Sequence, residues 1–356
     1  MTVHLGLARE NFHCLVDGEL FLPESWDADR DRCREAGIPD SLTYQPKWKI
    51  ALDLLDRANA NGICFDWLTF DEGYGSKPEL LREFTARKQL YVAEVPRSLG
   101  GWLEPPRVVT RKYRRNGRGR GRKTPRLASG SQPVRRVDEL LQDPKLRDQP
   151  WQQYRVKDGE KGPMVWECKH VMFTVKGADG LPGERLHLLV ARNVLDQDEV
   201  KFFVSNAPPE TRVETLLLVA FSRWKVERCF EDQKSEIGLD QYEGRRYLGL
   251  KRHLMISAVS YLFLARVREE WAKKKPGDHG LPTAHGDGRI GTIVELVVTS
   301  SQGGSAGKGG QENRVGAEPQ CGRPKEPHEG DQEKAAGARH QAHHAEKVSL
   351  GHYLAL

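Results

Sequence analysis

The chain has 356 residues, which is enough for two domains or for one domain that carries an insertion. Its hydrophobic fraction of 38% is compatible with a sizeable core, and its formal net charge of +6 is unevenly distributed. The six cysteines form no CxxC pair, which argues against a zinc site or a disulfide framework and favours a reducing cytoplasm. No signal peptide is indicated, and the longest apolar run, at 252–267, is too short for a membrane span.

The N-terminal part of the chain alternates between strand-like and helical patterns. The strand-like runs lie at 2–8, 12–22, 62–75 and 90–96. Helical periodicity covers 47–60, and the S-x-x-E pattern at 76–79 predicts the capped start of another helix. The order strand, helix, strand, helix, strand predicts an α/β sheet.

A segment at 98–210 interrupts this alternation. It contains the run RKYRRNGRGRGRK at 111–123, which has eight Lys or Arg residues and no acid. Such a run either contacts a polyanion or forms a solvated basic loop, and we expect contact with DNA. The expected DNA-binding residues are Arg111, Lys112, Arg114, Arg115, Arg118, Arg120, Arg122 and Lys123. From 166 onward strand patterns return, separated by turns at 178–180 and 196–198, which predicts an antiparallel β insertion.

The last third of the chain changes character. A long helical region is expected to begin at a cap on Thr211, and another helix covers 247–274. From about residue 276 the composition shifts, and 301–346 contains no aromatic residue and no Leu, Ile or Met. Such a composition cannot bury a core, so we expect a disordered tail, and the abrupt change suggests a shifted reading frame. Within the tail, the run at 290–299 is typical of a strand.

The stretch SRWKVERCFEDQKSEIG at 222–238 has no Gly or Pro before its last residue, which predicts a helix. At 100° per residue its apolar side chains fall in one narrow stripe, which consists of Val226, Phe230 and Ile237. The arc beside that stripe carries one acid and two cations, which are Glu227, Arg223 and Lys234. The pattern therefore places a carboxylate between two cations at the edge of a buried face.

Two interpretations of this helix remain open. It is either an amphipathic helix with i,i+4 ion pairs, each worth a few tenths of a kcal/mol, or the carrier of a functional acid. The functional interpretation needs a second carboxylate elsewhere in the chain. Glu231 is an alternative to Glu227, but it lies farther from the arc of Arg223 and Lys234.

Asp71 is the second candidate acid. It ends the strand-like run CFDWLTF within the motif TFDEGYG. An acid at the carboxyl end of a strand, followed by glycine, points to the crevice where α/β sheets bind ligands, although an Asp before Gly also forms ordinary turns. The neighbouring Glu72 competes for the same role. Together with Glu227, Asp71 provides the carboxylate ligands that Mg²⁺ accepts alongside water and phosphate oxygens.

These motifs resemble those of DDE transposases of bacterial insertion sequences, in particular the insertion sequence 701 type, which is related to the insertion sequence 4 type. Arg223, Glu227 and Lys234 match the R, E and K of the signature Y-x2-R-x3-E-x6-K, while Ala220 stands at the Tyr position. TFDEGYG is similar to the motif of the second acid, which gives that role to Asp71. The runs LFLPESWDADRDRCREAGIP and GLDQYEGRRYLGLKRH are also similar to family segments, and the resemblance spans residues 2–275.

The resemblance implies an RNase H-like fold, with a mixed sheet and helices and an antiparallel β insertion between the second and third acids. It implies catalytic roles for four residues, which are Asp71, Glu227, Lys234 and Arg223. Of these, Asp71 and Glu227 would hold Mg²⁺, for which Mn²⁺ could substitute. The implied partners are DNA, as element ends and target, and further copies of the chain, in the bacterial cytoplasm at the nucleoid.

The resemblance divides the chain into four parts. Residues 1–97 are expected to form the first part of the catalytic domain, 98–210 the insertion, 211–275 the helical remainder with the third acid, and 276–356 the tail. In this family the first acid stands on the first strand, which is expected to precede the start of this chain. Asp17 is a possible substitute, but its context LVDGELFLP matches a later strand.

The expected activity is metal-dependent cleavage of insertion-sequence ends and strand transfer into target DNA. Because the first acid is not found in its usual context, a catalytically inactive DNA-binding remnant is the alternative. A plain nuclease is a third, less favoured interpretation.

Overall fold

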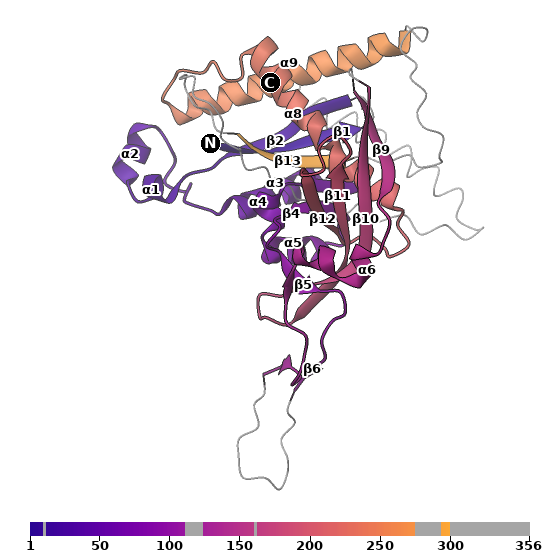
Figure 1. Cartoon of the computed structure of the whole chain (residues 1–356). Coiled ribbons are helices and arrows are strands. Elements are labelled where there is room, and N and C mark those ends of the chain that lie inside the picture. Colours follow the sequence, from indigo (N-terminus) through magenta and orange to yellow (C-terminus); the bar gives the residue numbers. More distant parts are fainter. Residues whose placement is uncertain (10–11, 111–123, 160–161, 275–292, 300–356) are drawn as a thin grey trace, which may run out of the picture.

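The computed structural model describes residues 1–9, 12–110, 124–159, 162–274 and 293–299, and these residues build one mixed eleven-stranded sheet with helices on both faces (Figure 1). Across the sheet the strands follow the order β2, β1, β13, β3, β4, β12, β11, β10, β5 and β8. The strand β9 lies off this path and pairs with the N-terminal part of β10. The expected α/β class with a mixed sheet is therefore confirmed.

One half of the sheet contains the strands that surround the candidate site. They are β2 (Phe12–Leu20), β1 (Thr2–Arg9), β13 (Ile293–Thr299), β3 (Trp67–Phe70) and β4 (Tyr91–Val95). The strand β13 pairs antiparallel with β1 and parallel with β3, and β3 pairs parallel with β4. The strand expected near 290–299 thus exists, and it lies in the interior of the sheet.

The other half is antiparallel and comes from the predicted insertion. Its strands are β5 (Gly100–Trp102), β8 (Arg135–Arg136), β9 (Gln152–Gly159), β10 (Gly162–Lys176), β11 (Pro182–Asn193) and β12 (Val200–Ser205). Because β12 pairs antiparallel with β4, these strands continue the main sheet. A separate two-stranded ribbon, β6 (Val108–Val109) with β7 (Arg126–Leu127), projects away from this half (Figure 1).

Side-chain alternation along β3 and β4 places two cores on opposite faces of the sheet. Phe70 and Tyr91 face the larger core, which is covered by α3 (Lys47–Ala60) and α5 (Pro78–Ala86). Trp67 and Val92 face the second core, which is covered by α7 (Val213–Ala220). Two short helices lie within the insertion, η1 (Glu139–Gln142) and α6 (Pro144–Arg147).

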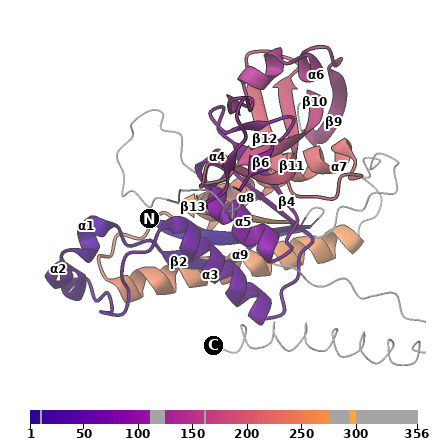
Figure 2. The ribbon, with the colours of Figure 1, turned by 90° about the horizontal axis from the view of Figure 1, so that it is seen from below.

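Two helices cover the β2–β1 end of the sheet, namely α8 (Trp224–Ile237) and α9 (Tyr247–Lys274) (Figures 1 and 2). The predicted apolar stripe of α8 is confirmed, because Val226 is fully buried, Phe230 is 5% exposed and Ile237 packs on the same cluster. The helix ends at Gly238, which has φ +72° and therefore adopts the left-handed conformation that glycine tolerates best.

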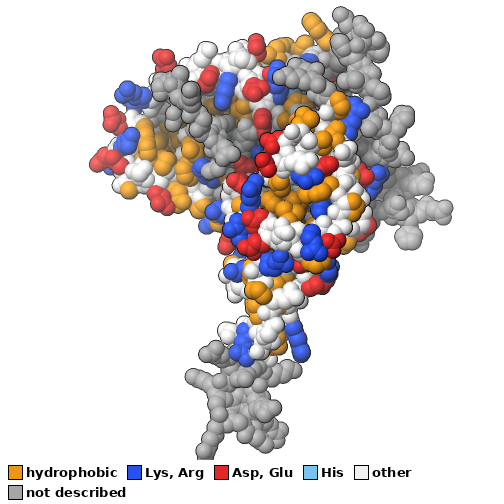
Figure 3. Space-filling view, in the orientation of Figure 1, with side chains coloured by type: hydrophobic (Ala, Val, Ile, Leu, Met, Phe, Trp, Pro, Cys, Tyr) orange, Lys and Arg blue, Asp and Glu red, His pale blue; other side chains and the backbone are white. Residues whose placement is uncertain are grey.

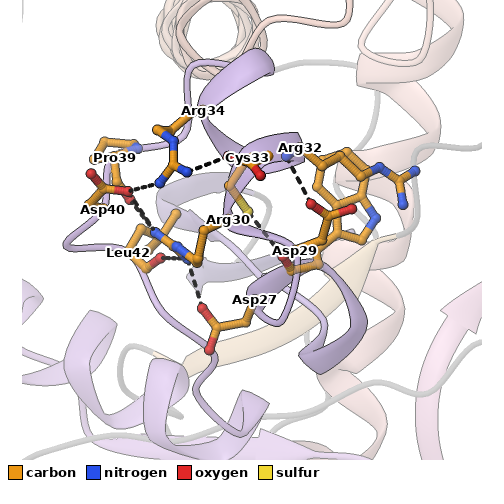
Figure 4. A network of polar contacts seen from close by, with 11 residues as sticks. Asp27, Asp29, Arg30, Arg32, Cys33, Arg34, Pro39, Asp40 and Leu42 are labelled. Carbon is orange, nitrogen blue, oxygen red and sulfur yellow. Dashed lines mark hydrogen bonds and ion pairs between the residues drawn. The ribbon is translucent and has the colours of Figure 1, made fainter.

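The segment that follows β2 folds into a compact pair of short helices, α1 (Glu24–Asp27) and α2 (Arg30–Glu35) (Figure 4). Arg30 donates to Asp27 at 2.8 Å and to the carbonyl oxygen of Leu42 at 3.1 Å. The backbone N–H of Tyr247, where α9 begins, donates to the carbonyl of Ala36 at 2.8 Å. This helix pair therefore connects the end of β2 to the start of α9.

Two predicted helix caps are wrong. Ser76 does not cap α5, because the N-cap is Lys77 and Pro78 occupies the first helical position, where its fixed φ suits the helix. The Ser76 hydroxyl donates instead to the carbonyl of Gly73 at 3.0 Å. Likewise, α7 begins after Arg212 without a side-chain cap, and Thr211 belongs to the preceding turn.

None of the helices in the described ranges combines the length and apolar character needed to cross a membrane.

Candidate active site at the carboxyl end of strand β3

Asp71 lies directly after β3, where the backbone is still extended, with φ −87° and ψ 179°. All four residues of β3 are buried, and Asp71 itself is 7% exposed. Its Oδ1 accepts a hydrogen bond from the backbone N–H of Gly73 at 2.9 Å and so caps the single turn α4 (Glu72–Gly75). The predicted position at a strand end is confirmed, and the side chain also performs the turn-forming role that was weighed against it.

The residue beside Asp71 on the next strand is Glu94. In the parallel pair of β3 and β4, Thr69 lies level with Val92 and Phe70 with Ala93, so the next step brings Asp71 level with Glu94. Adjacent strands are about 4.8 Å apart. Glu94 faces the side covered by α7, as Val92 does, whereas Asp71 lies beyond the end of β3 and its charge acts on Lys47 at the start of α3.

The backbone of α4 lies very close to the backbone of β4 at Gly75. A Cβ atom added to Gly75 would lie 1.9 Å from the carbonyl oxygen of Glu94, a separation that no side chain permits. The second glycine of the motif TFDEGYG is therefore needed for packing, because only a residue without a side chain fits there.

Glu94 binds two cations from other elements. Its Oε1 accepts from Lys201 Nζ of β12 at 2.8 Å, and its Oε2 pairs with Nη1 of Arg223. The side chains of Glu94 and Arg223 are each 14% exposed. Burial alone would raise the pKa of Glu94, but Arg223 and Lys201 lower it below its usual value.

Arg223 does not belong to a continuous α-helix with Glu227. Phe221–Arg223 form a 3₁₀ turn, η2, and α8 begins at Trp224 without a side-chain cap. The predicted helix at 222–238 is therefore two residues too long at its start. Glu227 lies in the first turns of α8 with a half-buried side chain. Its role as the third acid stays a prediction.

Lys234 lies at the other end of α8. Seven residues of α-helix separate it from Glu227 by about 10 Å along the axis. Lys234 lines an open hollow together with Glu231, Asp232 and Asp240. The structure therefore brings Arg223 to β4 and Lys234 to this hollow, whose acids are Glu231, Asp232 and Asp240.

Asp17 is distant from Asp71. It lies on β2, three strand positions from β3 or about 14 Å across the sheet, and it pairs with Arg57 at 2.6 Å. The position next to β3 on that side belongs to the backbone of β13. Asp17 is thus no neighbour of the candidate acid, as its sequence context indicated.

The eight basic residues predicted to bind DNA, at 111–123, lie outside the described residues. The ribbon of β6 and β7 flanks that segment, and Lys and Arg side chains are visible where it projects (Figure 3). Arg107 and Arg126, which lie beside and within the ribbon, are exposed.

Two charged residues near Asp71, one acidic and one basic, were not identified from the sequence. Glu94 is one, and the signal was a single acid in the otherwise apolar strand LYVAEVP. Lys47 is the other. Burial lowers its pKa, and the nearby charge of Asp71 partly offsets this effect. The Lys47 ammonium lies 5.1 Å above the ring of Phe21.

The donor set for a metal ion is small. Within the described ranges no group of three or more His, Cys, Asp or Glu side chains is arranged to hold a metal. Mg²⁺ commonly uses only one or two carboxylates and completes its shell with water and phosphate oxygens. Asp71 and Glu227 fit that mode by their chemistry, as carboxylates contributed by a strand end and a helix.

Comparison with known protein families identifies a match over the N-terminal part of the chain. Residues 1–163 match the family described as DDE superfamily endonuclease, and a comparison with curated proteins found no match. The matched part runs from β1 into β10 and includes Asp71 and Glu94. The match supports a relationship to DDE-type transposases and nucleases, which act on DNA, and the mixed α/β architecture is consistent with a DDE nuclease fold.

Proposed function

We propose that this protein is a transposase of the insertion sequence 701 type that cleaves the ends of its element and joins them to target DNA. The observation that carries the proposal is the position of Asp71, at the carboxyl end of β3 within the segment that matches the DDE family. The antiparallel strands between Asp71 and Glu227 support this proposal, because the transposases that the chain resembles carry a β insertion in their RNase H-like fold between the second and third acids. The proposed location of the protein is the cytoplasm of a bacterium, at the nucleoid.

In this proposal Asp71 and Glu227 hold Mg²⁺ or Mn²⁺ next to the scissile phosphate. The bound ion would activate a water or a 3′-hydroxyl and stabilise the leaving oxygen. The chain's own contribution is orientation. The hydrogen bond from Gly73 fixes one oxygen of Asp71, and the buried pair of Glu94 with Arg223 holds the start of α8. Lys234 and the basic segment at 111–123 would contact DNA phosphates.

A second candidate function is that of a DNA-binding remnant without catalysis. It is favoured by two observations: the described residues form no group of three or more His, Cys, Asp or Glu side chains arranged to hold a metal, and Asp17 lies three strand positions from β3. In that case the basic segment would still bind the DNA backbone, since this binding depends on charge alone.

The proposal includes self-association through α9. Six large apolar side chains on this helix are exposed, namely Leu248, Met255, Ile256, Phe263, Leu264 and Trp271. They form three pairs that share one centre between residues 259 and 260, because 248 and 271, 255 and 264, and 256 and 263 are equidistant from it. A two-fold axis through that centre would place each residue opposite its pair mate on a second copy, as a self-complementary interface requires.

The spacing also suits helix packing. Residues 248, 256 and 264 form one row at intervals of eight, and residues 255, 263 and 271 form the other. Both rows follow the i±4n ridges that interlock when two helices cross. The two-fold axis exchanges the rows, so the ridges of one copy would meet those of the other. The occupant of this face in the proposal is therefore a second copy of the chain.

The deciding experiment is strand cleavage of DNA that carries the element's own ends, with Mg²⁺ or Mn²⁺ present. We expect cleavage by the wild-type chain and none by Asp71→Asn. Glu72→Gln is the matched control, because it neutralises the adjacent acid and should cleave as the wild type does. DNA that is bound but not cleaved would favour the second function, a DNA-binding remnant without catalysis. Failure to bind DNA, measured in low salt, would reject both functions.

A further inference from the structure

Glu94 connects three elements that are far apart in the sequence. It lies on β4, it receives Lys201 from β12, and it receives Arg223 from η2, the turn that leads into α8. Each carboxylate oxygen has its own cation. Because Glu94 is also level with Asp71, this junction lies directly beside the candidate acid.

The start of α8 continues directly from α7 and η2, where Phe221 contacts the rings of Trp166 and Phe203 and the Ser222 hydroxyl donates to the carbonyl of Val219. The residue before the helix, Arg223, provides no side-chain cap, and the preceding 3₁₀ turn interrupts the α-helical hydrogen-bond pattern. Val226, in the first turn of α8, packs with residues of β2 and α9. The pair of Arg223 and Glu94 joins this segment to β4, the strand next to β3 and Asp71.

We propose that Glu94 is a positioning residue, which holds Arg223 and thereby sets where Glu227, four residues later, lies relative to Asp71. The inference rests on the proposed function, in which Asp71 and Glu227 act on one phosphate. It assigns Arg223 to orientation of the helix in place of direct contact with DNA. A guanidinium that is 14% exposed and already paired with a buried carboxylate is poorly placed to receive a phosphate.

The competing role for Arg223 makes opposite predictions. If Arg223 were a phosphate ligand that Glu94 masks, removing the Glu94 charge would release it and tighten DNA binding. If Glu94 positions α8, the same change loosens the start of the helix and leaves DNA affinity unchanged. Glu94→Gln therefore separates the two roles, because the amide keeps the shape of the side chain and removes its charge.

The first measurement is amide hydrogen exchange in the full chain without DNA. Glu94→Gln and Arg223→Gln should each accelerate exchange in the first two turns of α8 by about tenfold or more, since each removes the buried ion pair that joins this segment to β4. The matched control is Glu167→Gln. Glu167 is also 14% exposed and is paired with Arg192, but it lies on β10, so its replacement should leave α8 unchanged.

The second measurement is cleavage and DNA affinity of the same variants. Glu94→Gln and Arg223→Gln should lower the cleavage rate at saturating DNA, and the double variant should be no slower than either single one, because both changes break one contact. Affinity should stay at the wild-type value, and Glu94→Asp should restore part of the rate.

Unchanged exchange in α8, or tighter DNA binding by Glu94→Gln, would overturn the inference. If the wild-type chain does not cleave, the proposed function fails, whereas the exchange measurement still decides whether Glu94 holds α8.

Discussion

The ring nitrogens of His170 and His187, Nε2 and Nδ1, lie 2.8 Å apart between strands β10 and β11. His187 is fully buried, and its Nε2 lies 3.0 Å from the carbonyl oxygen of Pro208 and 3.2 Å from that of Ala207. Since a carbonyl only accepts, this Nε2 carries the proton, and Nδ1 accepts from His170. The two rings thus connect the antiparallel half of the sheet to the loop before α7.

The histidines predict a loss of stability in acid. Burial and the neighbouring His187 lower the pKa of His170 to about 4, and burial lowers that of His4 to about 4 as well. Because these folded-state values lie below the ordinary 6.5, the unfolded chain takes up protons first. We expect the free energy of unfolding to fall as pH decreases from 6.5 toward 4, with about 3 kcal/mol from the fully buried His4.

Urea unfolding at pH 7 and pH 5 measures this loss. His4→Gln should reduce the difference between the two pH values. His253→Gln, which changes a histidine on α9, serves as the control and should leave the difference as in the wild type. An equal pH difference in His4→Gln and wild type would contradict the assignment.

Gly75→Ala should disrupt the candidate site through packing alone. The added Cβ would meet the backbone carbonyl of Glu94 at 1.9 Å, so α4 or β4 must shift. We expect a loss of about 2 kcal/mol or more in unfolding free energy. Gly100→Ala is the comparison, because its Cβ would meet only the movable side chain of Val134, at 2.7 Å. A smaller loss for Gly75→Ala than for Gly100→Ala would show that the approach is less tight than described.

Asp71 variants should separate capping from catalysis. Asp71→Ala removes the acceptor for the Gly73 N–H and should cost about 1 kcal/mol of stability. Asp71→Asn keeps an oxygen acceptor and should cost much less, yet both variants should abolish cleavage. Thermal unfolding and the cleavage assay together test this. Equal destabilisation by the two substitutions would indicate that the cap contributes little.

The α9 pairing predicts a charge rescue. Ile256→Glu should weaken self-association, as should Phe263→Lys, because each places charge in the proposed interface. The double variant Ile256→Glu with Phe263→Lys should recover it, since the two-fold axis brings each Glu opposite a Lys. Sedimentation velocity reports the oligomeric state. Leu195→Glu, at an apolar residue that is 96% exposed elsewhere, is the control and should associate as the wild type does.

Local features of the fold were predictable from the sequence, and long-range pairings were not. The helix Lys47–Ala60, the end of α8 at Gly238 and the strand-end position of Asp71 all follow from nearby residues. The cap at Ser76 was mispredicted because Pro78 determines where that helix begins.

The partner of Arg223 could not be found from helical geometry. A wheel placed it beside Glu227, whereas the structure pairs it with Glu94, which is 129 residues away in the sequence. Only the position of one acid within an apolar strand pointed to Glu94. The basic run at 111–123 was easy to identify by composition, and its expected contact with DNA stays a prediction.

The interior position of β13 has a consequence for how the protein is made. Its partners β1 and β3 leave the ribosome more than 200 residues before it does, and each then presents an unpaired edge. Such edges readily pair with other chains. Closing the sheet requires a late, long-range insertion between strands that are already synthesised, which is a slow type of event. The yield of folded protein should therefore depend on chaperones that shield nascent chains during this interval.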